Sequence, residues 1–588
     1  MFKNLSLIIV MILGIVTISS FYSRSGCEDK LSPLEQLKKS ADKIELVRNR
    51  DNLLPLVTLD TLKLGYFTSS ESDLLLETLR LYTKTEKLNS NNTSSNLSVI
   101  KVENKSELDE LKNLNKTQKW IVLTSFDLVD DIPESVDAVF AAEELGEKEL
   151  QLIPQMIFGA RKVTNGNAKI KTLDRLGYTL PEAHGIDHQM LSHRLDSLVN
   201  LGLDSAAFPG CQILVAKEGD VIFHKTYGFT TYDKTTPVKK EMLYDWASVT
   251  KITGPLPLLM KLEEERKIDL DQPFSKYWKL FKKSNKRKLT LREILAHQAG
   301  LPSWLPYWTE TRKKSGKFKC RYVRDKQWRK AAEQFSDSLW VNHRFHKQIY
   351  KDIAEAPLLK SKKYKYSGLS FFVFPELISQ IMKEDYEKAL QKYFTASLGA
   401  YSVVFNPLKH GYKKEQIVPT EYDSVFRKQQ IHGWVHDEGA AIMGGISGNA
   451  GLFGSTNDLA KMMQMYMQMG HYGGKEYLKK KTMKKFTQIQ YPENENRRGL
   501  GFDKPYIDNN ENELIDAYPA VSTSKNSFGH SGFTGTFAWA DPDEELLFIF
   551  MSNRVYPTRN NSKLYDLNLR PQLHQAIYDC LNSYTKNK

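Results

Sequence analysis

The stretch YDWASVTKITG, residues 244 to 254, places a serine and a lysine three positions apart. Near the start of a helix, positions i and i+3 point the same way, so the Lys251 amine can reach the Ser248 hydroxyl. A serine hydroxyl is a weak nucleophile until a base removes its proton. A lysine in a partly desolvated pocket beside other cations can be that base. The pair therefore indicates nucleophilic catalysis through Ser248.

Spacing alone does not separate this pair from chance. The same Ser-x-x-Lys spacing recurs elsewhere in the chain, as at Ser40/Lys43, Ser522/Lys525 and Ser583/Lys586. The alternative interpretation is that Ser248 merely caps a helix and that Lys251 is solvated. Pro255 and Pro257 follow in the sequence and predict a kink about one turn after the lysine.

Two later stretches add groups that could act on the same serine. In KYKYSGLSFFVF, residues 363 to 374, Tyr366 opens an apolar run that predicts a helix. In FGHSGFTGTFAWAD, residues 528 to 541, we predict that His530, Ser531 and Gly532 begin a strand. Gly532 has no side chain, so a substrate backbone could approach that strand closely. Taken alone, the tyrosine is better explained by packing, and the histidine and glycine by an ordinary strand.

Taken together, the order Ser-x-x-Lys, Tyr-Ser-x, His-Ser-Gly resembles the three active-site motifs of the serine β-lactamase and penicillin-binding-protein superfamily. Its class C and esterase-like members are the most similar. PGCQILVAKEGDVIFHKTYGFTTYD, LTLREILAHQAGLP and GNAGLFGSTNDLAKMMQMYM also resemble stretches of that family. The likeness covers roughly residues 195 to 588. It implies a hydrolase domain over 190–588, with an antiparallel sheet flanked by helices and a helix-rich subdomain.

The resemblance also implies roles for the motif residues. Ser248 would be the nucleophile that forms an acyl-enzyme, with Lys251 and Tyr366 sharing proton transfer. His530 would orient the substrate and help to set the charge state of the tyrosine. The implied reaction is acyl transfer to serine and then to water, with no cofactor. A cell-wall peptide or other peptidoglycan fragment, a β-lactam or an ester would be the substrate.

The implied oxyanion site uses the backbone N–H of Ser248 and that of Phe533, just after the Ser531–Gly532 pair. Losing one such donor costs about 3 kcal/mol of barrier in enzymes of this kind. One departure from the family pattern is Gly368, which occupies the asparagine position of the Tyr-x-Asn motif. The family's asparagine amide contacts the lysine and the substrate carbonyl. Its loss weakens the expectation of efficient β-lactam hydrolysis more than that of ester or peptide hydrolysis.

A metal site is the other chemistry that the histidines suggest. The residues concerned are His297 in LAHQAGLP and His432, His436, Asp437 and Glu438 in HGWVHDEGA. Histidines at i and i+4 can share a helix face and bind zinc. No third ligand with a motif of its own accompanies them, and Gly439 and Gly444 favour a tightly packed turn over a stable helix. We therefore predict no metal site, and both stretches have structural counterparts in the resembling family.

Length and composition limit what else the chain can be. At 588 residues it fits about two or three domains. With 41% hydrophobic and 26% charged residues it is an ordinary globular protein. The net charge of +13 comes from lysine-rich runs at 282–292, 312–326 and 479–485. No nucleic-acid motif accompanies them, so we interpret them as solvated faces that could favour an anionic envelope surface.

The N-terminus predicts export. Residues 1–27 contain a lysine, an apolar core from Leu5 to about Ile18 and small polar residues, which is typical of a signal peptide or membrane anchor. Cys27 could carry a lipid, although Arg24 stands where a lipoprotein signal normally has an aliphatic residue. We expect a periplasmic or cell-envelope protein.

Residues 30–180 alternate strand and helix patterns and predict an α/β domain. ELVRNRDNLLPL, DAVFAAEEL and QMIFGARKVTNGNAKI resemble segments of the C-terminal α/β domain of family 3 glycoside hydrolases. That domain precedes a β-lactamase-like domain in some bacterial fusion proteins. The nucleophile of that family lies on a preceding (β/α)₈ barrel of about 200 residues or more, which cannot fit here. We expect a non-catalytic remnant that packs on the hydrolase domain or binds glycan weakly.

Beyond the hydrolase, the sequence leaves two alternatives: a catalytically silent peptidoglycan-binding envelope protein, and residual glycosidase action. Within the hydrolase region, alternating runs around Glu218-Gly219-Asp220 and Asp541-Pro542-Asp543 predict two β-hairpins. An aromatic and basic insert at about 303–363 lies in the helix-rich middle and is expected to line the substrate pocket.

Overall fold

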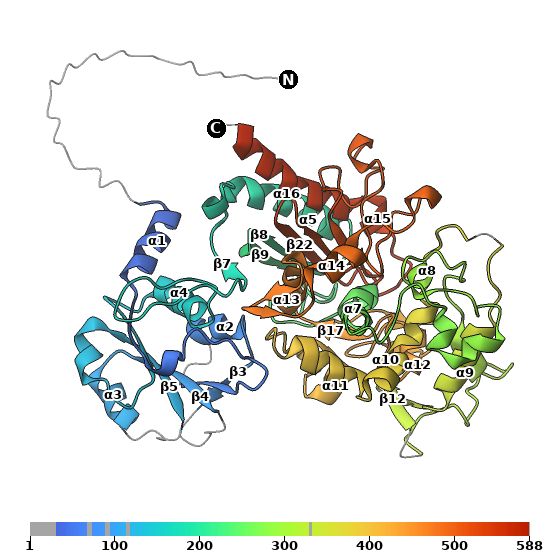
Figure 1. Ribbon diagram of the computed structural model, residues 1–588, viewed down its shortest axis with the longest axis horizontal. Helices are drawn as coiled ribbons and strands as arrows, with labels where there is room; N and C mark the ends of the chain where they lie inside the picture. The colour runs from blue at the N-terminus through green and yellow to red at the C-terminus, as the bar shows by residue number, and fades with distance from the viewer. Residues whose placement is uncertain are drawn as a thin grey trace, which may run out of the picture.

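The computed structural model describes residues 31–67, 73–88, 95–112, 118–328, 332–360 and 362–586. The predicted signal peptide or anchor at 1–27, with Cys27, lies outside these residues. Two six-stranded sheets organise the chain, one in the N-terminal part and one in the C-terminal part, and a helix-rich region flanks the second (Figure 1). No helix in the described segments is both long and apolar enough to cross a bilayer.

The first sheet has the order β1-β6-β5-β4-β2-β3, and only β1 runs antiparallel to its neighbour. Apolar side chains fill both of its faces, which explains why β6 is buried along its whole length. The elements are β1 Glu45–Asn49, β2 Leu64–Phe67, β3 Thr85–Leu88, β4 Leu97–Val102, β5 Lys119–Ser125, β6 Ala138–Ala142, α1 Pro33–Lys43, α2 Leu74–Arg80, α3 Lys105–Lys112 and α4 Glu147–Ile157.

The second sheet has the order β20-β21-β22-β8-β9-β7 and is antiparallel except for the β7–β9 pair. Helices α5 and α16 pack on one face and α13 on the other (Figure 1), so all seven residues of β22 are buried. The elements are β7 Gly177–Tyr178, α5 His188–Asp204, β8 Gly210–Lys217, β9 Asp220–Gly228, α13 Thr456–Met467, β20 Phe528–Ser531, β21 Phe537–Asp541, β22 Leu546–Ser552 and α16 Leu569–Lys586.

Both predicted hairpins are confirmed. Strands β8 and β9 pair across a turn at Glu218 and Gly219, which adopt φ values of 53° and 84°. Glycine takes such positive values without steric penalty, so Gly219 suits this turn. Strands β21 and β22 pair across residues 542–545. The hairpins form the centre of the sheet whose edge strand, β20, carries the His-Ser-Gly motif.

The helix-rich region lies between β10 and the C-terminal strands in sequence. Its helices are α6 Thr250–Thr253, α7 Pro255–Glu264, α8 Leu291–Leu295, α9 Phe345–Glu355, α10 Phe374–Met382, α11 Tyr386–Leu390, α12 Glu438–Ile442 and α14 Lys480–Thr487, with α15 Lys563–Asp566 beyond β22. Its short strands are β10 Tyr244–Asp245, β11 Val323–Arg324, β12 Ala332–Ser336, β13 Leu339–Asn342, β14 Val404–Phe405, β15 Tyr422–Asp423, β16 Gln429–Gln430, β17 Leu452–Gly454, β18 His471–Tyr472 and β19 Lys475–Glu476. The predicted break in the first helix occurs at Gly254, between α6 and α7.

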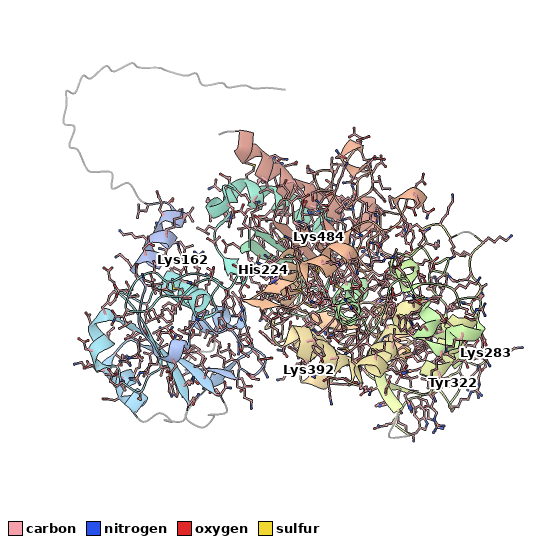
Figure 2. The ribbon with its side chains drawn as sticks, in the orientation of Figure 1. Lys162, His224, Lys283, Tyr322, Lys392 and Lys484 are labelled. Carbon is pink, nitrogen blue, oxygen red and sulfur yellow. The ribbon has the colours of Figure 1, made fainter. Side chains whose placement is uncertain are left out.

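The basic runs are mostly exposed, as expected for solvated faces. Lys283 and Lys484, labelled in Figure 2, belong to two of them and face solvent. Lys286 is an exception, because its buried amine donates to the side chain of Asn285 at 2.8 Å and to the Ala354 carbonyl at 3.1 Å. Burial lowers the pKa of Lys286 to about 8.

Polar side chains of α13 form hydrogen bonds that link the N-terminal domain, which contains the first sheet, to the C-terminal part of the chain. The Lys461 amine donates to the Gly399 carbonyl at 2.7 Å and contacts the Tyr82 carbonyl at 3.4 Å. The Asn457 amide donates to the Leu81 carbonyl at 2.8 Å. Each bond gives a partner to a backbone carbonyl in a buried or partly buried contact, where hydrogen bonds to water are lost. The front domain is therefore held in place by specific hydrogen bonds.

We predict that Gly399→Ala loosens this contact. Gly399 has φ 68°, and a Cβ there would lie 2.0 Å from the Tyr82 carbonyl oxygen. Gly411→Ala is the matched control, because Gly411 has φ 85° and an added Cβ would meet nothing within 4 Å. Both changes carry a backbone penalty of about 1–2 kcal/mol. Gly399→Ala should lower the free energy of unfolding in urea by about a further 1–3 kcal/mol. Equal losses in the two variants would contradict the close packing.

Candidate active site

Three predicted side chains meet beside α6. Ser248 lies in a 3₁₀ turn, Ala247–Val249, that follows strand β10, and Lys251 lies in the next turn. The Lys251 amine donates to the Ser248 hydroxyl oxygen at 2.9 Å, and the Tyr366 hydroxyl donates to the same oxygen at 3.0 Å. The Ser248 side chain forms no helix cap. The structure therefore gives the serine the surroundings of a nucleophile rather than those of a capping residue.

The Lys251 amine is held without a carboxylate. Its side chain is 2% exposed, and the amine also donates to the Asn449 carbonyl at 2.8 Å. The rings of Tyr366 and Phe371 lie 5.3 and 5.5 Å away. Among the described residues, no carboxylate forms an ion pair with this amine. It can therefore exchange a proton with Ser248 without breaking a salt bridge.

The turn that presents Ser248 is fixed by buried hydrogen bonds. Ala247 has φ 46°, a left-handed conformation that costs about 1–2 kcal/mol for a residue with a side chain. The Asp245 carboxylate accepts from the Ala247 N–H at 2.8 Å and from the His436 N–H at 2.6 Å. The Trp246 indole donates to the Gly454 carbonyl at 3.1 Å. These bonds stabilise a strained turn at the site, as is common where a nucleophile is exposed.

The His-Ser-Gly motif lies at the end of a strand, and the prediction that it begins one was wrong. Strand β20 ends at Ser531, and the Gly532 N–H then donates to the Thr536 carbonyl at 2.7 Å to close a turn. A Cβ on Gly532 would lie 2.6 Å from the Trp246 carbonyl oxygen and 3.3 Å from the Ala247 Cβ. The missing side chain thus brings this turn directly against the turn that holds Ser248.

The two predicted oxyanion donors have no internal partner. Within the described residues, neither the Ser248 N–H nor the Phe533 N–H donates a hydrogen bond. The Phe533 side chain is 48% exposed and lies 5.5 Å from the His436 ring. The Thr534 hydroxyl donates to the Asp245 carbonyl at 2.8 Å, which ties this turn to β10. Both N–H groups are therefore available to a substrate oxygen.

His530 is buried and neutral. Its Nδ1 lies 2.7 Å from the Ser531 carbonyl, and its Nε2 lies 3.3 Å from a terminal guanidinium nitrogen of Arg498. We assign the proton to Nδ1, because a carbonyl can only accept and a guanidinium can only donate. Burial, together with the charges of Arg498 and Lys251, lowers the pKa of His530 to about 3. Because this imidazole is neutral, it supplies no positive charge beside Tyr366, and any such charge must come from another residue.

Gly368 leaves room beside the reacting groups. Its backbone, at φ −87° and ψ −10°, suits any residue, and the atoms nearest to an added Cβ are the Asn449 Cβ at 3.9 Å and the Ser303 carbonyl oxygen at 4.0 Å. The Asn449 amide is already engaged, because it donates to Asp437 at 3.2 Å and accepts from the Ser447 hydroxyl at 2.7 Å. These two bonds occupy the amide oxygen and one of the two N–H donors of the nearby asparagine, and so fix the orientation of its amide.

Comparison with known proteins identifies the family. The family model described as Beta-lactamase matches residues 195–570. A protein of Salmonella typhimurium named "Putative D-alanyl-D-alanine carboxypeptidase" is 30% identical over 410 residues, which is 65% of this chain and 87% of the relative. A Salmonella typhi protein of the same name matches equally well. The chain belongs to the Beta-lactamase family. The resemblance predicted from the three motifs is confirmed, and so is the β-lactamase/transpeptidase-like fold of the C-terminal two-thirds.

Three solved structures are each similar to about two thirds of this family member. A penicillin-binding protein homologue from Caulobacter crescentus is 18% identical with a TM-score of 0.48, covering 66% of this chain and 97% of its own. A class C β-lactamase from Rhodobacter sphaeroides is 15% identical with a TM-score of 0.47, covering 66% and 100%. EstCE1, described as a hydrolase with promiscuous acyltransferase activity, is 17% identical with a TM-score of 0.47, covering 66% and 99%. The kinship of the front domain with family 3 glycoside hydrolases stays a prediction.

The histidines considered for a metal are not brought together in this Beta-lactamase-family site. His297 packs its ring 4.6 Å from the Tyr366 ring, and its Nδ1 accepts from the Ser367 N–H at 3.1 Å. The His432 Nε2 contacts the Lys414 and Ile417 carbonyls. His432 and His436 do not share a helix, because α12 begins only at Glu438. Three neighbouring carboxylates, Glu421, Asp423 and Glu438, are paired with the guanidinium groups of Arg427 and Arg559.

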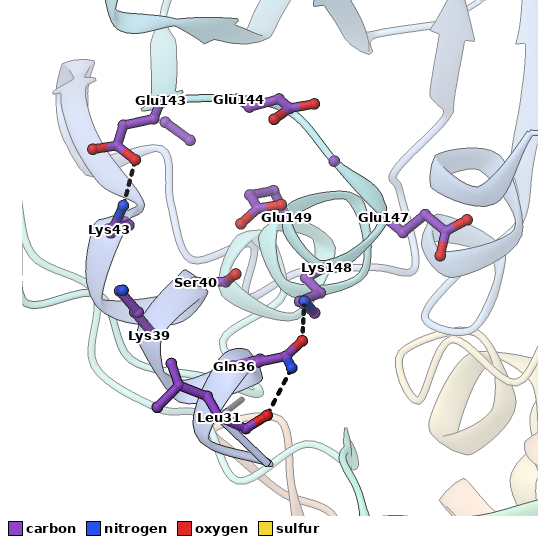
Figure 3. A pocket seen from close by; sticks show the side chains of 12 residues that line it. Leu31, Gln36, Lys39, Ser40, Lys43, Glu143, Glu144, Glu147, Lys148 and Glu149 are labelled. Carbon is purple, nitrogen blue, oxygen red and sulfur yellow. Dashed lines mark hydrogen bonds and ion pairs between the residues drawn. The ribbon is translucent and has the colours of Figure 1, made fainter. Parts of the chain in front are cut away.

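The other Ser-x-x-Lys matches have different partners. Lys43 pairs with Glu143 in a surface cleft of about 510 Å³ in the front domain (Figure 3), where Lys148 also donates to Gln36 at 2.8 Å. The Ser522 hydroxyl accepts from the Gln575 amide at 2.8 Å. The side chains of Ser583 and Lys586 lie outside the described part of the chain. Of the matches that can be compared, Ser248 is the one whose lysine reaches the serine.

We expect Gly532→Ala to impair acylation of Ser248. The added Cβ would lie 2.0 Å from the Thr536 hydroxyl oxygen and 2.6 Å from the Trp246 carbonyl, so the turn bearing the Phe533 N–H must move away. Removing one oxyanion donor typically slows such reactions about 10²–10³-fold. The measurement is the rate of Ser248 labelling by a fluorophosphonate.

Gly146→Ala is the control, because its Cβ would meet only the mobile end of Glu149, at 3.2 Å. A labelling rate for Gly532→Ala that stays within about twofold of the control would show that this turn supplies no donor.

Proposed function

We propose that this Beta-lactamase-family protein is a serine hydrolase that forms an acyl-enzyme at Ser248. The observation that carries the proposal is that the Ser248 hydroxyl oxygen accepts hydrogen bonds from both Lys251 and Tyr366. Two titratable donors on one hydroxyl, with Lys251 in a site that lacks a carboxylate counter-ion, form an arrangement suited to moving a serine proton. A structural serine needs neither of them.

The contacts suggest a sequence of proton transfers. Either Lys251 or Tyr366 must first lose its proton, so that it can accept the one on Ser248 as the serine oxygen attacks the acyl carbon. The Ser248 and Phe533 N–H groups then stabilise the oxyanion. The captured proton passes to the leaving nitrogen or oxygen as its bond to the acyl carbon breaks. Water attacks the acyl-enzyme by the same steps and restores the Ser248 hydroxyl.

The substrate that we favour is a peptide with a D-alanyl terminus, with esters as a second class. The support is the name carried by the Salmonella relatives, which are 30% identical over 410 residues. Gly368 argues against efficient β-lactam turnover, because position 368 carries no side-chain amide where the family has one. A β-lactam would then acylate Ser248 and leave slowly.

We further propose that the protein is exported, with the front domain as a docked module that holds or weakly binds glycan strands. The N-terminal sequence motivates export, and the hydrogen bonds from α13 to the Leu81 and Tyr82 carbonyls motivate docking. A silent peptidoglycan-binding protein is the second candidate function, and Gly368 is the observation that favours it.

The decisive experiment incubates wild-type protein and Ser248→Ala with a D-alanyl-D-alanine peptide, a short-chain ester and a fluorescent penicillin. We expect release of D-alanine or alcohol and a covalent penicillin adduct in the wild type alone. Turnover that survives Ser248→Ala would contradict the proposal. Wild-type protein that is inert to all three, together with sacculus binding that survives Ser248→Ala, would favour the silent candidate.

The Tyr366→Phe variant tests the role of the tyrosine hydroxyl, which is the second hydrogen-bond donor to Ser248. It removes one hydroxyl and keeps the ring that packs on His297 at 4.6 Å. We predict a loss of about 10²–10⁴-fold in kcat/KM for the ester, because proton transfer to the leaving group fails. The thermal midpoint should hardly change. Tyr307→Phe removes a buried tyrosine hydroxyl and is the control, since no hydrogen-bond partner of that hydroxyl is found in the described segments. Equal activity in both variants would exclude Tyr366 from proton transfer.

Gly368→Asn tests whether the missing amide limits β-lactam turnover. The position has space for a side chain and an ordinary φ of −87°, so we expect a folded protein of unchanged stability. Release of the penicilloyl group should become at least about tenfold faster, with Gly368→Ala as the control that adds only the Cβ. Equal release rates in the two variants would show that the amide is not what limits deacylation.

A further inference from the structure

Arg498 is a charged side chain that the catalytic motifs do not include. It lies in the loop between α14 and β20, in the sequence RRGLGFDK, and is 1% exposed. One terminal nitrogen pairs with Asp503 at 2.9 Å. The other donates to the Gly501 carbonyl and to the His530 Nε2, both at 3.3 Å. A buried guanidinium with these partners cannot swing into solvent, so its charge is fixed in place.

The guanidinium faces the proposed proton-transfer group. Its central carbon lies 5.7 Å from the centre of the Tyr366 ring. Lys251 lies 5.3 Å from the same ring centre. A cation within about 6 Å of an aromatic ring is attracted to it, and the attraction grows when the phenol loses its proton. Arg498 and Lys251 are thus two cations that act on one tyrosine.

The local charge balance leaves a net positive charge here. Arg497 and Arg498 both pair with the single carboxylate of Asp503, at 2.7 and 2.9 Å. Burial alone would raise the pKa of Asp503, but the two arginines outweigh it and hold that pKa well below its usual range. Two guanidinium groups and one carboxylate leave one positive charge. His530 adds none, because it stays neutral between Arg498 and the Ser531 carbonyl.

We propose that Arg498 is a positioning residue that supplies the buried positive charge beside Tyr366, stabilises the tyrosinate when the phenol gives up its proton, and fixes the His530 ring through Nε2. The proposal rests on the acyl-enzyme function proposed above. It accounts for a neutral histidine in the third motif, since a second cation is already in place behind it. The titratable or charged groups around Tyr366 include Lys251 of α6, His297 after α8, His530 of β20, Arg498 with Asp503 behind it, and Tyr364, which precedes Tyr366 by two residues.

The test is the pH dependence of Ser248 acylation, measured with a fluorescent penicillin between pH 5.5 and 10 under single-turnover conditions. In Arg498→Gln the rate at pH 7 should fall at least about tenfold, and the midpoint of the rising limb should move up by about one pH unit or more. The rate at high pH should approach that of the wild type, because the tyrosinate then forms without help. Arg498→Lys keeps the charge and should hold the midpoint near that of the wild type.

Arg497→Gln is the matched control. It removes the other guanidinium from Asp503, but that group stacks on Tyr506 and Tyr518, at 4.6 and 4.8 Å, rather than on Tyr366. Because Arg497 belongs to the same charge cluster but stacks on other rings, the midpoint should move up by clearly less than in Arg498→Gln. A uniform loss of rate at every pH in Arg498→Gln, or an equal shift in Arg497→Gln, would overturn the proposal.

Asp503→Asn extends the test if Arg498→Gln does not fold. It keeps both arginines and removes their counter-charge, so the midpoint should move to lower pH, and an unchanged or raised midpoint would overturn the proposal. Wild-type protein that acquires no label at Ser248 contradicts the acyl-enzyme function itself. That outcome is distinct, because it appears before any variant is compared.

Discussion

The close approach of two turns is the constraint on which the site depends. Gly532 packs against the Trp246 carbonyl and the Ala247 Cβ, which leaves no space for a side chain. This contact packs the end of strand β20 against the turn that presents Ser248. The edge of the sheet therefore lies directly against the start of the helix. The bonds from Thr534 and Thr536 to the Asp245 and Trp246 carbonyls, at 2.8 and 3.1 Å, hold the two turns together.

The charged and titratable groups around Ser248 make different contacts. Lys251 and Tyr366 contact the hydroxyl itself, whereas Arg498 acts from behind the tyrosine and His530. The Asp503 carboxylate pairs with the two arginines, and the Asp245 carboxylate accepts from backbone N–H groups of Ala247 and His436. The lysine is thereby left without a counter-ion, which suits a group that must exchange protons.

The sequence predicted the parts of the site that short motifs specify. Ser248 and Lys251 are three residues apart, so local helix geometry brings them together, and the family likeness added Tyr366. The sequence analysis placed His530 at the start of a strand, whereas it lies near the end of one. A strand pattern lies on both sides of Gly532, and the sequence does not show that Gly532 and Thr536 close a turn between the two strands. Arg498 was missed because its role depends on a contact across 32 residues, and arginine pairs are common on surfaces. The docking bonds of Lys461 likewise depend on tertiary contacts that no periodicity reveals.

The proposed mechanism requires that Ser248 becomes acylated and that the acyl oxygen binds the backbone N–H groups of Ser248 and Phe533. A crystal structure of the penicillin-treated protein measures this most directly. We expect continuous density from the Ser248 hydroxyl oxygen to the acyl carbon, with the acyl oxygen within about 3 Å of the Ser248 and Phe533 nitrogens. An adduct on another residue, or an acyl oxygen turned away from both nitrogens, would contradict it.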